Sequence, residues 1–185
     1  MIKLQDNEIM CSVRDGDLKK MGILFDKYHK RLFNFFLRQT RDQQTSEDLV
    51  QDVFYRMLKY RQSYRGDSAF TTWMFSVARS AFYTHYRKKK LKTDSYKSVE
   101  DLKSTDQSPA DTVEKDHQTE LIHKALARLP RKKREVLLLS RFENMKYKDI
   151  AKVMGCKLGT IKARVHSALQ DLAVIYEDIS GEVLK

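Results

Sequence analysis

Aromatic and basic side chains occur together in residues 71–90, TTWMFSVARSAFYTHYRKKK. Aromatic rings stack on unpaired bases, and a basic groove beside them binds the phosphates of the same strand. The pattern therefore predicts the binding chemistry of a single-stranded nucleic-acid site. The residues suited to it are Trp73, Tyr83, Tyr86, Arg87 and Lys88 in this stretch, and Tyr64 in the segment before it.

Helix packing is a second explanation for the same aromatic residues. On a helical wheel one apolar stripe runs along this stretch, and Phe75 and Phe82 lie nearly opposite it. A central helix that packs on both sides would show this arrangement, and we favour packing for these two residues. Periodicity does not separate packing from base stacking for the others. The apolar stripe consists of Phe70, Met74, Val77 and Ala81.

Residues 147–166 have the spacing of a helix-turn-helix motif. Ala151 is small where two helices approach closely, and Gly155 suits a turn with positive φ. Ile161 is expected to fill the core between the two helices. In a basic chain this spacing favours binding to duplex DNA, although an ordinary helical hairpin is the alternative.

The helix that follows this turn has an apolar side and a small, polar side. A small, polar face can enter the major groove. Lys162 can reach a guanine edge or a phosphate, and Lys157, Thr160 and Arg164 flank it and suit phosphates. The apolar side has Leu158, Ile161, Val165, Ala168, Leu169 and Leu172; the outward side has Gly159, Lys162, Ala163, His166, Ser167 and Gln170.

An acidic face is predicted on the helix over residues 46–60. Its members point away from the apolar residues Leu49, Val53 and Met57. Acidic residues make a poor DNA surface, so this face suits the docking of another protein, and solubility is the alternative. The face consists of Asp48, Gln51, Asp52 and Tyr55.

Helices are expected to position the aromatic and basic stretch, the helix-turn-helix and the acidic face. Gly and Pro are scarce, at 6 and 2 residues, so the sequence predicts an all-α protein. Three helix starts have candidate capping residues: Asp17, Thr45 or Ser46, and Ser68. The expected helices cover residues 17–39, 46–60, 70–90, a segment ending at Pro130, 131–142, 147–154 and 158–178.

The stretch between the two nucleic-acid motifs differs in composition. Residues 93–120 have eight acidic and three basic residues, are rich in Ser, and lack periodicity until their end. Such a stretch is typical of a flexible linker. The sequence therefore predicts an N-terminal domain at 9–92, an acidic linker at 93–112 and a C-terminal domain at 113–180.

Composition also limits the function classes. The 185 residues carry a net charge of +11, which favours a polyanionic partner. No run of apolar residues is long enough to span a membrane, and the N-terminus lacks the apolar core of a signal peptide. We expect no membrane insertion and a cytoplasmic location. Cys11 and Cys156 are too few for a metal set, so we expect neither a metal nor a cofactor.

The chain resembles bacterial sigma factors of the extracytoplasmic-function (ECF) group, within the sigma-70 family. SEDLVQDVFYRML is similar to the family's polymerase-docking helix, and FTTWMFSVARSAFYTHYRKKK to its promoter-melting and −10-reading helix. The segment from LARLPRKK to VHSALQDL is similar to its C-terminal, −35-reading domain. The resemblance implies two helical domains and a non-enzymatic role in transcription initiation.

The resemblance also implies a role for each part of the chain. The acidic face would bind the coiled coil of the polymerase β′ subunit, and the C-terminal domain would sit on the β flap. The acidic linker would thread the RNA-exit path. The loop from Tyr64 to Ser68 and the helix after it would open the −10 element and hold a flipped base. Family members are often held by an anti-sigma factor. The −10 residues would be Tyr64, Trp73, Arg79, Ser80, Tyr83, Thr84, Tyr86, Arg87 and Lys88; the −35 residues would be Lys157, Thr160, Lys162, Ala163, Arg164, His166 and Ser167.

Three positions depart from the family pattern. Ser80 and Thr84 stand where Asn and Asp are frequent, and Ser167 stands where a basic residue is common. The first two are expected to alter the −10 preference. A different function class, a stand-alone helix-turn-helix regulator with a sensing or dimerising N-terminal domain, explains the C-terminal half equally well. A nucleic-acid enzyme would need a carboxylate or His cluster, and Asp48 and Asp52 have no third partner.

Overall fold

The computed structural model describes residues 6–94 and 115–183, and every regular element in these two ranges is a helix. The all-α class predicted from composition is therefore confirmed. The helices form two compact units, the first made chiefly of those before the gap and the second chiefly of those after it. The expected linker lies almost entirely outside the described residues.

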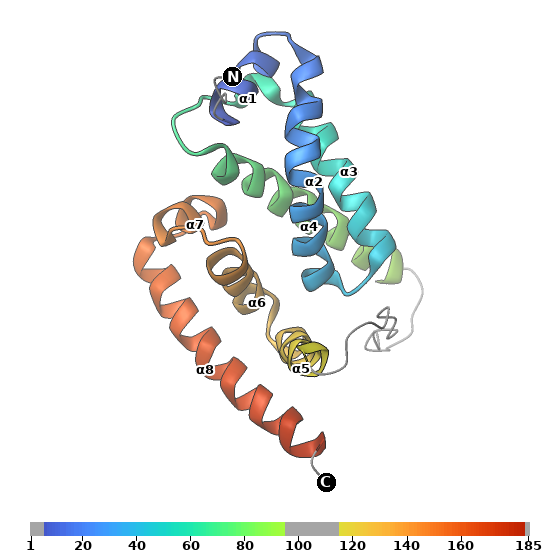
Figure 1. Cartoon of the computed structure of the whole chain (residues 1–185), viewed down its shortest axis with the longest axis vertical. Coiled ribbons are helices and arrows are strands. Elements are labelled where there is room, and N and C mark those ends of the chain that lie inside the picture. The colour runs from blue at the N-terminus through green and yellow to red at the C-terminus, as the bar shows by residue number, and fades with distance from the viewer. Residues whose placement is uncertain (1–5, 95–114, 184–185) are drawn as a thin grey trace. The chain divides into compact units, whose positions relative to one another are not determined.

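The first unit is built around α4, which packs against α3 and α2 (Figure 1). Phe75 of α4 meets Phe35 of α2 edge to face, with ring centroids 5.2 Å apart. Phe82, on the same side of the helix, is also buried. The elements are α1 (Asp6–Arg14), η1 (Leu18–Lys20), α2 (Met21–Thr40), α3 (Gln43–Lys59), η2 (Arg61–Ser63) and α4 (Phe70–Asp94).

Helix α4 is buried on two sides, which confirms the packing explanation for Phe75 and Phe82. The opposite stripe is buried as well, except for Val77, which is partly exposed. Burying both sides removes far more apolar area from water than one stripe would, and apolar burial is the main stabilising contribution to the unit. The buried members of the stripe are Phe70, Met74 and Ala81, and Ala78 beside them is buried as well.

The predicted capping hydrogen bond is absent at Asp17, and at α3 another residue provides the cap. Asp17 makes no capping hydrogen bond; it precedes η1 and its carboxylate lies 3.6 Å from the Lys20 ammonium. Helix α3 is capped by Asp42, whose Oδ1 accepts the Thr45 N–H at 2.6 Å. At α4 the cap comes from Asn7 of α1, whose Oδ1 accepts the Phe70 N–H at 2.8 Å. Helix α1 itself was not expected.

The second unit contains the helix-turn-helix motif, and its long last helix packs on α5 and α6. Ion pairs reinforce this packing: Lys133 lies 2.6 Å from Asp171 and Arg128 lies 2.9 Å from Asp178. A cluster of Leu121, Ala125 and Ile179 fills the space between α5 and the C-terminal half of α8. The elements are α5 (Lys115–Arg128), α6 (Arg131–Leu137), the π-helix η3 (Leu138–Phe142), α7 (Tyr147–Met154) and α8 (Leu158–Val183).

Candidate nucleic-acid interface

The turn between α7 and α8 has the geometry expected of a helix-turn-helix. Gly155 has φ +61°, a conformation that glycine adopts without a steric cost. The Cys156 N–H donates to the Ala151 carbonyl at 3.1 Å and closes the turn. Ile161 is fully buried, as predicted for the residue that fills the inter-helix core.

The outward face of α8 presents small and polar side chains to solvent. Lys162, Ala163 and His166 are exposed, as are Lys157 and Thr160 at the start of the helix. Arg164 and Ser167 are half-buried. The structure therefore gathers the predicted −35 residues at the first two to three turns of one helix. On the apolar side, Leu158 and Leu169 are exposed rather than buried.

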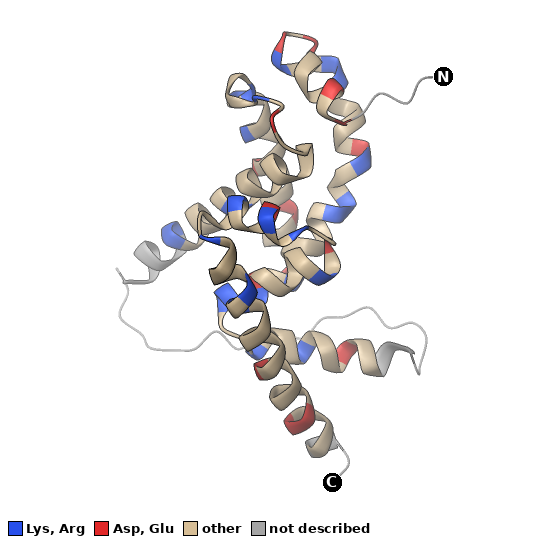
Figure 2. Ribbon diagram, turned by 90° about the vertical axis from the view of Figure 1, so that its left-hand side faces the viewer, with Lys and Arg blue, Asp and Glu red and all other residues tan. Residues whose placement is uncertain are grey.

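Charge is divided along α8. Its basic residues, Lys162 and Arg164, lie in the N-terminal half, and Asp171, Glu177 and Asp178 lie in the C-terminal half (Figure 2). The unsatisfied N–H groups of a helix N-terminus add a partial positive charge there. An anion is therefore attracted most to the first turns of α8, whereas Asp171 and Asp178 further along are paired with Lys133 and Arg128.

The candidate −10 residues on α4 form a partly exposed aromatic and basic surface. The Arg79 guanidinium lies 4.6 Å from the centre of the Tyr83 ring, a cation–π distance. Phe82 packs against Tyr83 and Tyr86, with both pairs of centroids 5.5 Å apart. The buried Phe82 thus supports two rings that keep part of their surface in solvent. Trp73, Arg79, Tyr83, Thr84 and Tyr86 are half-buried, whereas Ser80, Arg87 and Lys88 are exposed.

Tyr64 does not belong to this surface. It is 2% exposed, and its ring meets Trp73 edge to face at 5.1 Å. Its hydroxyl has no hydrogen-bond partner among the described residues, and burial raises the pKa of Tyr64 to about 12. The ring is therefore not available to stack on a base, which corrects the prediction from sequence. Its role in this structure is to support Trp73.

The predicted docking face on α3 is largely in solvent. Asp48 and Gln51 are exposed, and Tyr55 is 62% exposed, which is unusual for so large a ring. Asp52 is half-buried and accepts the Arg56 Nε–H at 2.9 Å, so part of its charge is neutralised. The four side chains lie on one helix, where they leave a mixed acidic and aromatic surface without a packing role.

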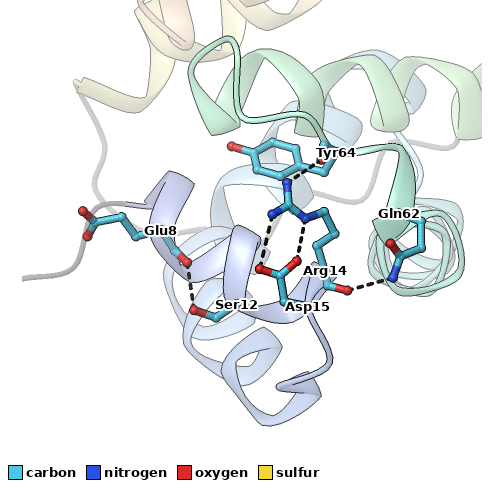
Figure 3. Close-up of polar contacts among 6 residues, drawn as sticks. All are labelled: Glu8, Ser12, Arg14, Asp15, Gln62 and Tyr64. Atoms are coloured by element: carbon cyan, nitrogen blue, oxygen red, sulfur yellow. Dashed lines mark hydrogen bonds and ion pairs between the residues drawn. The ribbon is translucent and has the colours of Figure 1, made fainter.

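Three residues around the 61–69 loop were not predicted from the sequence. Asn7 and Arg14 of α1 and Gln62 of η2 make hydrogen bonds that join α1 to this loop. Figure 3 shows the contacts of Arg14 and Gln62. Asn7 and Ser68 are 61 residues apart in the chain, so no local spacing indicates their contact. An Asn in a polar N-terminal segment carries no signal that sequence reasoning alone can use.

Comparison with known proteins assigns the family. A model of sigma-70 region 2 matches residues 24–92, and a model of sigma-70 region 4 matches residues 119–172. The ECF RNA polymerase sigma factor EcfG of Rhodopseudomonas palustris is 33% identical over 139 residues, which are 72% of each chain. This chain belongs to the ECF sigma factors. The sigma factor therefore carries both DNA-reading regions of the family in the expected order.

Two further matches cover more of this sigma factor. The RNA polymerase sigma-H factor of Pseudomonas aeruginosa is 29% identical over 173 residues, 89% of this chain and 90% of the relative. The solved sigma factor RpoE of Bartonella quintana, in complex with the anti-sigma factor NepR, has a TM-score of 0.75 and 26% identity. It covers 86% of this chain and 98% of its own. The stand-alone regulator is not favoured, because its sensing domain would occupy the region 2 match.

The described residues contain neither a membrane-spanning helix nor a group of side chains arranged as a metal site. No helix in residues 6–94 or 115–183 is long and apolar enough to cross a membrane. Within the same ranges, no group of three or more His, Cys, Asp or Glu side chains is arranged to hold a metal ion.

Proposed function

We propose that this sigma factor acts through three separate surfaces, one for core RNA polymerase and one for each promoter element. The observation that carries the proposal is the division of labour between helices: α8 offers a small, exposed polar face, α4 offers supported aromatic rings, and α3 offers an acidic one. None of these surfaces needs catalytic groups, so the polymerase performs the chemistry and the sigma factor has no enzymatic role.

The first turns of α8 read the −35 element as duplex DNA. Lys162 and His166 point to base edges in the major groove, and Ala163 and Ser167 leave room for close approach. Lys157, Thr160 and Arg164 contact phosphates on either side and set the register of the helix. The exposed state of most of these side chains supports this assignment.

The exposed edge of α4 holds the −10 element as it opens. Trp73, Tyr83 and Tyr86 stack on unpaired bases, and Arg87 and Lys88 neutralise the phosphates of the displaced strand. Ser80 is exposed and Thr84 half-exposed beside them, so both can contact bases. Arg79, held against Tyr83, adds a cation beside the stacking rings.

The acidic face of α3 docks on core polymerase. Asp48, Gln51, Asp52 and Tyr55 bind the β′ coiled coil, and the second unit rests on the β flap. Exposed aromatic residues are frequent at the centre of protein interfaces, which supports Tyr55 as the main contact. The cytoplasm, where polymerase and promoters are found, is the expected location.

An anti-sigma factor is a further expected partner. The solved relative from Bartonella quintana is bound to one. Such a partner would hold this sigma factor away from polymerase until a stress or other signal releases it.

Reconstituted transcription tests the proposal. Purified protein with core polymerase should start RNA synthesis at a defined promoter, and neither component alone should do so. Asp48→Lys combined with Tyr55→Ala should weaken core binding by at least about tenfold, whereas Asp26→Lys, an equal charge change at an exposed position of α2, should not. Tight binding of the isolated protein to promoter duplex, with no effect of polymerase, would contradict the proposal.

A further inference from the structure

Helix α1 holds the C-terminal end of the 61–69 loop through one side chain. The Asn7 amide donates from Nδ2 to the Ser68 carbonyl at 2.9 Å and accepts the Phe70 N–H at Oδ1 at 2.8 Å. Only one orientation of the amide satisfies both partners, so the bridge fixes Asn7 as well as the loop. The same residue therefore caps α4 and fixes the last turn of the loop before it.

The N-terminal end of the loop is tied to the opposite end of α1. Gln62 donates to the Arg14 carbonyl at 2.8 Å, and Arg14 Nη1 donates to the Tyr64 carbonyl at 3.3 Å (Figure 3). Asp15 holds the guanidinium in place through contacts of 2.8 and 3.2 Å, and this hydrogen bonding lowers the pKa of Asp15. Both ends of the loop thus bind to one short helix.

The middle of the loop lies close against α1 as well. Gly66 has φ +74°, and a Cβ built at this position would lie 3.5 Å from the Cys11 Sγ. Tyr64 is turned into the core, and the exposed residues of the loop are Gln62, Ser63, Arg65, Asp67 and Ala69. After η2 the loop contains no helix or strand up to the start of α4, so the shape of residues 64–69 depends on their contacts with α1.

Helix α1 is itself firmly anchored in the first unit. Ile9, Met10 and Val13 are buried in the core. Asp6 accepts hydrogen bonds from Lys27 at 2.6 Å and from the Tyr28 hydroxyl, both on α2. A continuous set of contacts therefore runs from the core through α1 to the exposed side of the loop.

We propose that α1 is a clasp that positions the 61–69 loop for capture of an unpaired −10 base, with Asn7 and Gln62 as its positioning residues. The proposal rests on the −10 function proposed above for α4 and extends it to the loop that precedes this helix. It adds that the loop is already ordered before DNA binds. The entropy lost on ordering the loop therefore does not weaken the binding of the open −10 strand. Loosening either tie raises that cost without removing any group that touches DNA.

Asn7→Asp tests the clasp without removing the helix cap. The carboxylate still accepts the Phe70 N–H and suits a helix N-terminus, but it cannot donate to Ser68 and repels that carbonyl. We expect about five- to tenfold weaker binding of holoenzyme to a single-stranded oligonucleotide carrying the non-template −10 sequence. Gln62→Ala, which frees the other end at an exposed position, should have an effect in the same direction.

Ser12→Asp is the matched control. It adds the same charge to the same helix, where the Ser12 hydroxyl is hydrogen-bonded to Glu8 and Lys20 rather than to the loop. We expect unchanged thermal unfolding for Gln62→Ala and Ser12→Asp and at most a small loss for Asn7→Asp. For all three variants, core affinity and binding of the −35 duplex should be unchanged. A merely structural role would lower these together with the oligonucleotide affinity.

The possible outcomes distinguish failure of the clasp from failure of the proposed −10 function on which it rests. If wild-type holoenzyme shows no preference for the −10 strand over a scrambled one, the proposed −10 function is wrong. If wild type prefers it and both Asn7→Asp and Gln62→Ala bind like wild type, only the clasp is wrong. If Ser12→Asp and Asn7→Asp lose oligonucleotide affinity equally and Gln62→Ala loses none, the added negative charge explains the effect, and the clasp is again wrong.

Discussion

Helices α4 and α8 are nearly equal in length, at 25 and 26 residues, but they are buried in different ways. Helix α4 is buried on two sides, so its solvent-facing edge is narrow and its aromatic rings are half-covered. The first turns of α8 are buried on one side only, through Ile161 and Val165. The remaining face is free and made of short or flexible side chains.

This difference matches two physical tasks. A base that leaves the duplex loses its stacking energy, and rings held by a core can replace that energy with little entropic cost. A duplex keeps its bases stacked and exposes only base edges and phosphates. The helix face that enters its groove must therefore carry small, polar side chains. The comparison predicts that mutations on the two helices affect different states of the same promoter.

The largest effect is expected on α8. Lys162→Ala combined with His166→Ala removes two side chains from the groove-facing surface, and each base contact contributes about 1–3 kcal/mol. Binding to a −35 duplex should weaken by about tenfold to 100-fold, while the −10 single strand and core polymerase bind as before. Fluorescence anisotropy with separate duplex and single-stranded probes measures both.

Lys124→Ala is the control for lost charge, since Lys124 lies on α5 and pairs with Glu120 at 2.7 Å. Its duplex affinity should stay within about twofold of wild type, because a distant surface charge is largely screened at physiological salt. A loss of core binding in the double variant would show that α8 does not have the separate duplex role assigned to it.

A smaller effect is expected from Trp73 on α4. Stacking of one base contributes about 1–3 kcal/mol, but Trp73 is half-buried and offers only part of its ring. Trp73→Ala should weaken binding of the −10 single strand by about tenfold and leave the −35 duplex unaffected. Trp73→Phe keeps a ring against Tyr64 and should recover most of the affinity. Failure of Phe to recover it would point to a polar rather than a stacking contact.

The sequence predicted α8 better than α4 and its surroundings. A single apolar stripe, a turn glycine and the scarcity of breakers were enough to predict α7 at its observed bounds and Ile161 as a core residue. These signals are local, and helical periodicity reports them directly. The exposed residues of α8 follow once the buried side is known.

The backbone path between helices and the contacts between elements account for what the sequence did not predict. Asp42, Thr45 and Ser46 are all good capping residues, and only the backbone path, with Arg41 at φ 57°, makes Asp42 the cap. The burial of Tyr64 depends on packing with Phe70 and Trp73, and the bridge of Asn7 spans more than sixty residues. Helical periodicity reports none of these contacts, because the first two depend on how the chain turns between helices and the third on a partner far along the chain.

Tyr64→Phe gives the smallest expected effect and tests whether the ring beneath Trp73 belongs to the core rather than to the DNA surface. Its hydroxyl is buried without a hydrogen-bond partner among the described residues, so at pH 7 its removal should leave the free energy of unfolding unchanged or raise it by up to about 1 kcal/mol.

At high pH the stabilities of wild type and Tyr64→Phe should diverge. The Tyr64 phenol has a pKa of about 12 in the folded chain and ionises near pH 10 when unfolded, at roughly the ordinary tyrosine value. Titration of this phenol therefore leaves the free energy of unfolding unchanged below pH ~10 and lowers it as pH rises toward the folded value, by about 1 kcal/mol at pH ~11. Tyr64→Phe lacks this loss, and Trp73, the one tryptophan in the chain, reports unfolding of this unit by fluorescence. Equal pH slopes for the two proteins would mean that the hydroxyl reaches water, and Tyr64 would then return to the set of residues that can meet a base.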